Sequence, residues 1–387
     1  MGILFALSLT HLFNDLLQSV VSAVYPILRD NLMLTFGQIG LITLVYQICA
    51  SVFQPLFGVL FDKRQSPYYL MIGTTSTMIG LLILAWSGSL AWVILAVSFV
   101  GLGSSIIHPE ASRLTHFASG GKHGLAQSIF QVGGNFGSSI GPLLAAAIVA
   151  PYGQRYIAVF AGIALISLLT KRPIVKWYKE RISSFNPTER AKEVIHRVRL
   201  SKKKIYFSLG ILLVLIFSKY VYTASLFSYY TFYLIEKFGV TTQQSQLFLF
   251  AYLFASAVGT LLGGPIGDRF GRKYVIWFSI LGTAPFALMM PYANLFWTCV
   301  LSIIIGIVLS SAFSAILVYA QELLPTKLGL ISGLFFGLAF GIAGIAAAVM
   351  GNIADVHGIE YVYRLCAFMP LLGFIAIFLP NVKPHRT

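Results

Sequence analysis

The sequence has little charge and very few acidic side chains. Only 10% of its 387 residues are charged, against about 25% in a typical soluble domain, and just 12 are Asp or Glu. A soluble protein of this length needs a polar surface that so few charged side chains cannot provide. This scarcity excludes a soluble enzyme, a secreted scaffold and a disordered protein. A net charge of +15 would suggest nucleic-acid binding in a polar chain, so the location of the basic residues matters.

Cysteine is also scarce, and motifs for metals and nucleotides are missing. Cys49, Cys299 and Cys366 lie far apart inside apolar stretches, without the spacing of a zinc site or of a disulfide framework. We expect them to be small core residues. The phosphate-binding pattern GxxxxGK[ST] does not occur, so neither a nucleotide nor another cofactor is expected. The chain enters an apolar stretch almost at Met1, which predicts a retained membrane span rather than a signal peptide.

What the sequence does have is long apolar blocks, since 57% of its residues are hydrophobic. A helix needs about 20 residues to cross a membrane, and the blocks predict an all-α protein of twelve transmembrane helices. The predicted spans are residues 3–28, 36–60, 69–88, 90–112, 124–149, 153–171, 205–235, 244–265, 274–293, 296–320, 328–351 and 360–380. They form two six-helix bundles, 1–171 and 205–387, joined by the polar linker 172–204.

The distribution of Lys and Arg predicts how the chain crosses the membrane. If the N-terminus lies inside, the outer loops hold only Arg29, Arg155, Lys237 and Arg364, while nearly all the other basic residues lie inside. Basic residues mark cytoplasmic loops, so both termini and the linker are expected in the cytoplasm. The linker charge then sets topology beside anionic lipid headgroups, and no nucleic-acid partner is expected.

Two loops repeat one pattern. The aligned residues, at one constant offset, are Gly58, Asp62, Lys63 and Tyr68 in the first loop and Gly264, Asp268, Arg269 and Tyr274 in the second. The segments that begin at Gly124 and Gly329 also resemble each other. Two similar halves in parallel indicate a duplicated transporter with its substrate bound between the halves near mid-membrane. In each loop the Gly permits close helix approach and the Asp can cap a neighbouring helix N-terminus; the alternative is a loop that only sets topology.

These residues carry a family resemblance. The second loop, with Gly264, Asp268, Arg269, Gly271, Arg272 and Lys273, resembles the signature loop of the major facilitator superfamily. The first copy keeps Gly58 and Asp62 but lacks the following Gly-Arg-Lys. The resemblance implies two pseudo-symmetric six-helix bundles of the major facilitator fold.

A second segment resembles the GxxxGP motif of antiporters in that superfamily. It contains Gly137, Gly141 and Pro142. Small residues four apart permit close helix packing, and the proline adds a bend that can act as a gate. Packing without any antiport meaning is the alternative. The Arg that drug antiporters of the family usually carry in the fourth span is missing from residues 95–101.

Five strings resemble, more narrowly, the fosmidomycin-resistance efflux proteins within that superfamily. They are residues 11–19, 103–113, 124–146, 217–234 and 311–325. They occur in both halves, so the resemblance runs end to end. It implies a protein of the bacterial inner membrane that exports a small phosphonate antibiotic in exchange for protons. A monomer is the default expectation for this architecture.

Ionisable residues inside the spans are costly and therefore candidate functional residues. His11 and Asp15 lie four apart on one helix face near mid-span, where burial favours the protonated carboxyl that a proton carrier needs. A fixed hydrogen-bonded role is the alternative. Glu110 and Arg113 lie three apart and can pair, so proton uptake on Glu110 could free Arg113 for an anion. Alternatively, this ion pair simply fixes the helix. The predicted proton-coupling residues are Asp15, Glu110 and His11.

Lys219 is the cation expected to bind the substrate. It lies well inside the second half among tyrosines, and a Lys ammonium with Tyr hydroxyls suits phosphonate or carboxylate oxygens. Pairing with an acidic residue such as Asp15 is the alternative. Polar stripes on two spans fit either substrate contacts or interhelical hydrogen bonds. The predicted substrate-binding residues are Lys219, Arg113, His108, Gln131, Asn135, Gln47, Tyr222 and Tyr230.

The sequence therefore predicts a secondary transporter that exports a small anionic drug for protons by alternating access, with membrane lipid as its surroundings. The nearest alternative is an uptake or exchange carrier for organic phosphates or other metabolites on the same fold. A membrane-embedded enzyme with His11, Asp15, His108 and Glu110 as metal ligands or acid–base groups is disfavoured, because the paired halves would have no purpose. A scaffold or receptor is disfavoured because buried charge would serve no use.

Overall fold

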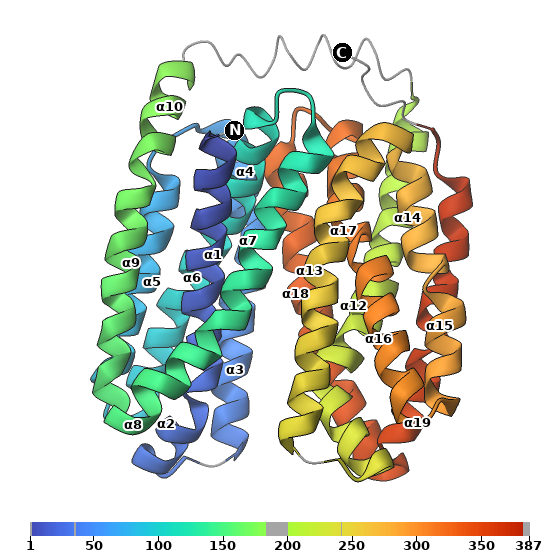
Figure 1. The fold of residues 1–387 in the computed structure, drawn as a ribbon. Helices are drawn as coiled ribbons and strands as arrows, with labels where there is room; N and C mark the ends of the chain where they lie inside the picture. The colour runs from blue at the N-terminus through green and yellow to red at the C-terminus, as the bar shows by residue number, and fades with distance from the viewer. Residues whose placement is uncertain (1, 35, 183–199, 241, 382–387) are drawn as a thin grey trace. The chain divides into compact units, whose positions relative to one another are not determined.

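The computed structural model of the chain describes residues 2–34, 36–182, 200–240 and 242–381. These residues are helical almost throughout, and no strand occurs among them (Figure 1). Within these ranges, nine helical segments are long and apolar enough to cross a membrane. The other three predicted spans are helical too, as α5 (Tyr69–Ala85), α7 (His123–Leu144) and α13 (Thr242–Phe270). The predicted all-α membrane fold is confirmed.

The chain divides into two compact units. Unit 1 comprises Met1–Gly120, Ile129–Arg197 and Leu324–Gly337. Unit 2 comprises Gly121–Ser128, Val198–Leu323 and Leu338–Thr387. Each unit therefore includes a short segment from the other half of the sequence.

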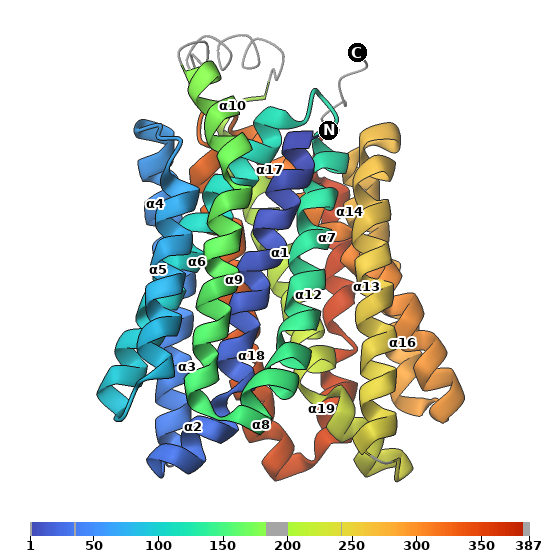
Figure 2. The same ribbon diagram turned by 60° about the vertical axis from the view of Figure 1, so that its left-hand side comes forward.

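The helices of both units are labelled in Figures 1 and 2. Those of unit 1 are α1 (Gly2–Ala23), α2 (Tyr25–Leu32), α3 (Phe36–Ser51), α4 (Phe53–Lys63), α5, α6 (Leu90–Ala118), most of α7, α8 (Ala150–Tyr152), α9 (Ala158–Thr170) and α10 (Arg172–Ile182), with a π-helical turn at Ala145–Val149 and a 3-10 turn at Gln154–Ile157. Those of unit 2 are α12 (Lys202–Phe238), α13, α14 (Arg272–Leu281), α15 (Ala284–Met289), α16 (Leu295–Ser310), α17 (Ala312–Leu323), most of α18 (Leu328–His357) and α19 (Ile359–Cys366), with 3-10 segments at Met290–Tyr292 and Met369–Phe378. Residues 172–182 of the predicted linker thus form a helix, α10.

Several predicted spans consist of two helices, and proline explains one of the breaks. The span 36–60 is interrupted at Val52, between α3 and α4. Pro55 follows the break and has no N–H to donate to the Ser51 carbonyl, so the helical ladder loses a hydrogen bond there. Gln54, beside the break, is fully buried, and its Nε2 donates to the Ala50 carbonyl oxygen at 2.6 Å.

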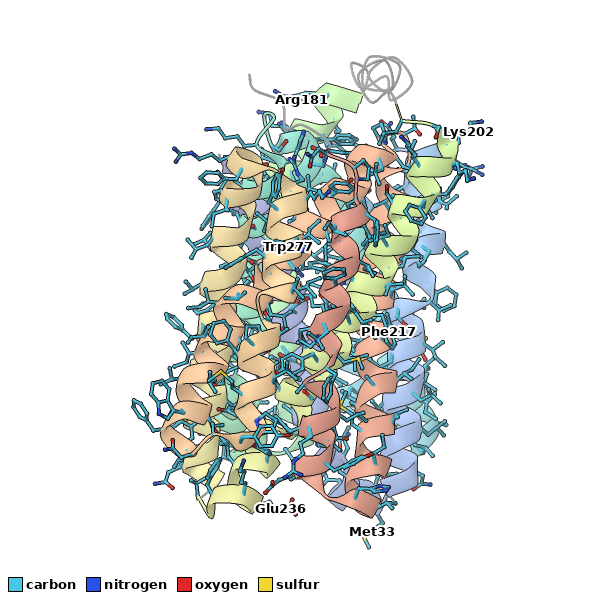
Figure 3. The ribbon with its side chains drawn as sticks, turned by 90° about the vertical axis from the view of Figure 1, so that its right-hand side faces the viewer. Met33, Arg181, Lys202, Phe217, Glu236 and Trp277 are labelled. Carbon is cyan, nitrogen blue, oxygen red and sulfur yellow. The ribbon has the colours of Figure 1, made fainter. Side chains whose placement is uncertain are left out.

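The outer surface of unit 2 is apolar along most of its length. Phe217 and Trp277 point outward and are 46% and 39% exposed (Figure 3). The charged residues Lys202 and Glu236 lie at the two ends of α12 (Figure 3). Exposed aromatic and aliphatic side chains between charged ends are expected of a surface in contact with lipid.

Glycines on α7 bring its backbone into direct contact with α1. A Cβ atom added at Gly137 would overlap the Leu12 carbonyl, and one added at Gly141 would overlap Ser19. Both glycines belong to the segment that resembles the antiporter motif, and the third member, Pro142, lies in the last turn of α7. The small residues therefore hold α7 against the face of α1 that carries the ionisable side chains.

Gly137→Ala is expected to destabilise the protein, because the new methyl group meets backbone atoms that cannot move aside. Overpacking of this kind costs about 1–3 kcal/mol. Gly162→Ala in α9 is the matched control, since nothing lies within 4 Å of its added Cβ. Thermal unfolding of the purified protein in detergent should show a lower midpoint for Gly137→Ala only. Equal midpoints for the two variants would contradict the close packing of α1 on α7.

Candidate functional site

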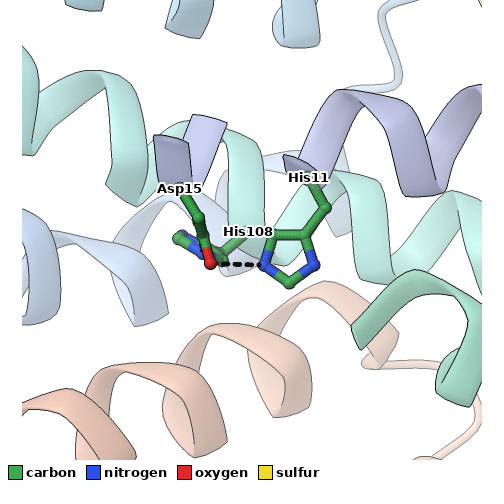
Figure 4. A group of neighbouring side chains, drawn as sticks. All are labelled: His11, Asp15 and His108. Carbon is green, nitrogen blue, oxygen red and sulfur yellow. Dashed lines mark hydrogen bonds and ion pairs between the residues drawn. The ribbon is translucent and has the colours of Figure 1, made fainter. Parts of the chain in front are cut away.

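Two histidines and one aspartate form a cluster inside unit 1 (Figure 4). His11 and Asp15 lie on α1, and His108 comes from α6. His11 Nε2 is 3.2 Å from Asp15 Oδ2, and His108 Nε2 is 3.2 Å from Asp15 Oδ1. His11 and His108 are 2% and 0% exposed. The carboxyl group predicted to carry a proton is thus held between two imidazoles, one of which the sequence had assigned to substrate binding.

The second nitrogen of His11 determines where a proton must sit. His11 Nδ1 is 2.8 Å from the Phe130 carbonyl oxygen, which can only accept a hydrogen bond. Nδ1 therefore carries a hydrogen, and a neutral imidazole then has a bare lone pair on Nε2. That lone pair would face a carboxylate oxygen at 3.2 Å. The contact is favourable only when an additional proton lies between His11 Nε2 and Asp15 Oδ2.

His108 is less constrained. Its Nδ1 lies 3.1 Å from both the carbonyl oxygen and the hydroxyl of Ser104. The hydroxyl can donate to Nδ1, which leaves a hydrogen on Nε2 that points at Asp15. A neutral His108 can therefore donate to the carboxylate, whereas a neutral His11 cannot. The contact that needs an added proton is therefore the one between Asp15 and His11.

Aromatic rings and a glycine enclose the cluster. The Phe130 ring stacks on His11 with centroids 4.1 Å apart, and the Phe336 ring lies 5.3 Å from that of His108. Gly134 on α7 covers the remaining side, because a Cβ atom there would overlap both His11 and Asp15. Apolar surroundings strengthen electrostatic interactions, so protonation of the cluster has a large effect on its energy.

Two amides and a phenol extend the cluster along α1 and onto α3. Asn14 Nδ2 donates to Asp15 Oδ1 at 3.0 Å, and Gln18 Nε2 donates to the same oxygen at 3.4 Å. The hydroxyl of Tyr46 on α3 donates to Gln18 Oε1 at 2.7 Å. Asp15 Oδ1 therefore faces three donors, while its Oδ2 faces His11.

The cluster also has the composition of a metal site. In the described ranges its three side chains are the one group of His, Cys, Asp or Glu whose ligand atoms all lie within 4.8 Å of one another. Two imidazoles and a carboxylate are a donor set that Zn²⁺ accepts. An added proton between His11 and Asp15 satisfies these atoms, so the arrangement does not need a metal.

Glu110 and Arg113 form a buried pair on α6. Arg113 Nε and Nη2 each donate to a Glu110 carboxylate oxygen at 2.8 Å. Nη2 also donates to the hydroxyl of Tyr178 on α10, again at 2.8 Å. The side chains of Arg113 and Glu110 are 2% and 1% exposed. This geometry favours the role of fixing helices, because the guanidinium joins α10 to α6 rather than presenting itself to a ligand.

Each repeated loop uses its aspartate to cap a helix. Asp62 accepts hydrogen bonds from the backbone N–H groups of Gly329 and Leu330, in the first turn of α18, at 2.8 and 2.9 Å. In unit 2, Asp268 accepts from Gly124 and Leu125, in the first turn of α7, both at 3.0 Å. A carboxylate at a helix N-terminus pairs with unsatisfied N–H groups and with the helix dipole. Gly58 and Gly264 allow these approaches, since a Cβ at either position would overlap the backbone of the capped helix.

The second loop carries additional charged contacts. Arg272 Nη2 donates to Asp268 Oδ1 at 2.9 Å, and Arg272 Nη1 lies 3.1 Å from Glu322 Oε1. Gly271 precedes α14 with φ of 103°, a backbone conformation that favours glycine. Arg269 is exposed and lies over the Phe270 ring. The loop that resembles the family signature is therefore an ion-pair network around one helix cap.

Lys219 is enclosed by aromatic rings near the middle of α12. Its Nζ lies 4.9 Å from the centroid of Tyr220 and 5.4 Å from that of Phe313, and the residue is 6% exposed. Within the ranges that the structure describes, no acidic side chain pairs with it. Tyr222 and Tyr230, predicted to accompany it, are 1% and 0% exposed, so in this conformation they are packed inside unit 2.

The remaining predicted binding residues are spread over α3 and α7. Gln47 and Gln131 are partly buried, and Asn135 is exposed within the chain. Gln131 Oε1 is buried without a hydrogen-bond partner among the described residues. An unsatisfied amide oxygen inside a protein is costly, which is consistent with a position that a ligand or water completes.

Three contributors were not identified from the sequence. Tyr178 fell in the predicted linker, although Ile174 and Tyr178 are four apart and both buried, which is the spacing of a helix face. Tyr46 and Phe336 are single aromatic residues in apolar spans. Nothing in the sequence distinguishes them from the many aromatic residues that face lipid.

Comparison with known proteins agrees with this architecture. The family model described as Major Facilitator Superfamily matches residues 7–241 and 211–387. The chain is 56% identical to the Fosmidomycin resistance protein of Escherichia coli (strain K12) over 380 residues, covering 98% of this chain and 93% of that protein. It is 41% identical to the uncharacterized MFS-type transporter YfnC of Bacillus subtilis (strain 168), covering 99% and 94%. The fold matches the E. coli fucose:proton symporter FucP with a TM-score of 0.72 at 16% identity, covering 98% of both chains. The family resemblance predicted from the sequence is confirmed.

Glu110→Gln is expected to destabilise the protein strongly, because it leaves the Arg113 charge buried without a counter-ion. Removing one partner of a buried ion pair costs about 3–5 kcal/mol. Glu360→Gln is the matched control, since Glu360 and Arg364 form an exposed pair at 3.5 Å. Exposed pairs contribute about 0–1 kcal/mol. Thermal unfolding should therefore separate the two variants clearly. Similar melting temperatures would show that the buried pair does not fix α10 to α6.

Proposed function

Because the chain belongs to the major facilitator superfamily, and is therefore a multi-pass bacterial membrane transporter rather than an enzyme, we propose that it exports a small anionic drug in exchange for protons by alternating access. The proposed drug is of the phosphonate type and resembles fosmidomycin. The observation that carries the proposal is the contact between His11 Nε2 and Asp15 Oδ2, which requires a proton.

The substrate class rests on the relative from E. coli. That protein is named for fosmidomycin resistance, and the identity of 56% extends over nearly the whole of both chains. Efflux of the drug is the simplest way in which a transporter confers resistance. Similarity of this extent supports the same substrate class for this chain.

Proton coupling is supported by the chemistry of the cluster. When the proton between His11 and Asp15 leaves, a lone pair faces a carboxylate in a site closed by Phe130 and Phe336. Both side chains lie on α1, and they contact Phe130 on α7 and His108 on α6, so relief of that repulsion would disturb how α1 packs against these two helices. An event that changes charge inside an apolar site is a suitable trigger for a two-state transporter.

Anion binding is supported by Lys219. Its ammonium group contacts aromatic faces and has no acidic partner in the part of the chain that the structure describes. A buried cation without a counter-ion is unfavourable, and an anionic ligand would supply the missing charge. Phosphonate oxygens are acceptors of the kind that a lysine point charge binds.

The membrane potential favours this direction of exchange. The basic loops favour a cytoplasmic location for both termini and the linker. The interior of a bacterial cell is electrically negative relative to the outside. Moving one charge through the potential is worth about 2.3 kcal/mol per 100 mV. Outward movement of an anion and inward movement of a proton are both downhill. Uptake or exchange of organic phosphates remains the alternative function, and the direction of proton-driven flux separates the two.

Inverted membrane vesicles containing the protein should accumulate fosmidomycin when a proton gradient, acidic inside, is imposed. Asp15→Asn should abolish this accumulation while retaining drug binding, because the amide keeps the shape but cannot take part in the proton exchange. Glu236→Gln, at the exposed end of α12, is the control and should transport normally. Undiminished proton-driven transport by Asp15→Asn would make the cluster purely structural. Absence of accumulation by the unmodified protein would favour the alternative carrier.

Lys219→Met should weaken drug binding by about tenfold or more, because a hydrogen bond to a charged group contributes about 1.5–3 kcal/mol. Lys219→Arg keeps the charge and should retain much of the affinity. Equilibrium binding of labelled drug to purified protein measures both variants. If Lys219→Met binds as tightly as the unmodified protein, the anion is held elsewhere.

A further inference from the structure

We propose that Tyr46 on α3 is a positioning residue for the proton site, acting through Gln18. Its phenol holds the Gln18 amide so that the amide N–H group, and not the oxygen, faces Asp15. The inference rests on the proposed function and assigns a role in it to two residues outside the His11–Asp15–His108 cluster.

The hydrogen bonds of Gln18 determine which way its amide points. Tyr46 donates to Gln18 Oε1 at 2.7 Å. Gln18 Nε2 then faces Asp15 Oδ1 at 3.4 Å and the Asn14 carbonyl oxygen, also at 3.4 Å. In these three contacts the Gln18 amide nitrogen faces two acceptors and the Gln18 amide oxygen faces one donor, so every hydrogen bond is satisfied. The opposite orientation would set the amide oxygen against a carboxylate oxygen and leave the Tyr46 hydroxyl facing an NH₂ group.

This orientation makes the two oxygens of Asp15 unequal. Oδ1 faces Asn14 Nδ2 at 3.0 Å, His108 Nε2 at 3.2 Å and the Gln18 amide. Oδ2 faces His11 Nε2. Negative charge is stabilised at the oxygen with three donors, and the exchangeable proton is directed to the side of His11. The Gln18 amide therefore contributes to the stabilisation of the negative charge on Oδ1.

The groups that face Asp15 come from several elements, and few of them are charged. The titratable ones are His11 on α1 and His108 on α6. The helix α7 contributes the backbone at Gly134, and α3 contributes Tyr46 through Gln18. The helix α18 contributes Phe336, which contacts the imidazoles. Tyr46 thus belongs to a chain of hydrogen bonds that links the carboxylate to α3 through Gln18.

Tyr46 acts by position and not by carrying the proton. A proton that moved from Asp15 to Tyr46 would have to pass through the Gln18 amide, which neither gains nor loses a proton readily. Removal of the phenol should therefore change the pH at which the site titrates, and leave the maximal rate of transport nearly intact.

The test is Tyr46→Phe, which removes one hydroxyl and keeps the ring. Without the phenol the amide loses one of its three hydrogen bonds, is held less firmly and donates less to Asp15, so the proton is held more tightly. The pH of half-maximal drug transport should rise by about 0.5–1 unit, with the maximal rate changed less than about twofold. The titration of the His11 and His108 resonances by NMR of the purified protein should show a change in midpoint that does not depend on transport.

Gln18→Ala supplies the test of mechanism. It should shift the profile in the same direction, and Tyr46→Phe should add nothing in a Gln18→Ala background, because both changes remove one interaction. Tyr69→Phe is the matched control, since its phenol donates to the Arg64 carbonyl and does not touch the cluster. Its profile should match that of the unmodified protein.

An unshifted profile and unshifted NMR midpoints in a folded Tyr46→Phe protein would overturn the inference, and so would additive shifts in the double variant. If Tyr46→Phe does not fold, an unshifted NMR midpoint in Gln18→Ala overturns it equally. Failure of the unmodified protein to couple drug and protons would instead count against the proposed function. The NMR midpoints test the role of Tyr46 in that case as well.

Discussion

The structure depends on the need to satisfy one carboxylate buried inside an apolar helical bundle. Asp15 lies on α1 where water is scarce, and an ionised carboxylate without partners would be strongly unfavourable there. The chain supplies two imidazoles, one from the same helix and one from α6. Because His11 Nδ1 donates to the Phe130 carbonyl, the contact between His11 Nε2 and Asp15 is favourable only with an added proton. In the proposed mechanism, stability and proton binding therefore depend on the same contact.

The surrounding helices are arranged to make that contact possible. Gly134, Gly137 and Gly141 bring the α7 backbone against α1, and a side chain at Gly134 would occupy the space of the cluster. The carboxylates of the repeated loops also need hydrogen-bond donors, because Asp62 and Asp268 are partly buried. Each of them pairs with two backbone N–H groups. Acidic residues are rare in this chain, and those within its helices that the structure describes are mostly engaged with imidazole, guanidinium or backbone donors.

Much of this could be predicted from the sequence, and the limits have physical causes. Apolar blocks and the loop motifs predicted twelve helices and the family, because membrane span length and helix capping are local properties. The i, i+4 spacing placed His11 beside Asp15. The sequence could not bring His108 to the same carboxylate, since that contact depends on how α6 packs against α1. It also could not distinguish Tyr46 and Tyr178 from other aromatic residues, because their roles arise from single hydrogen bonds between helices.

The central claim is that a proton held between His11 and Asp15 is exchanged for the drug, and direct detection of that proton is the sharpest test. Purified protein in weakly buffered detergent solution, monitored with a pH-sensitive dye, should release protons when fosmidomycin is added. Asp15→Asn protein that still binds the drug should release none. Equal proton release by the two proteins would contradict the account, because the exchanged proton would then lie outside the cluster.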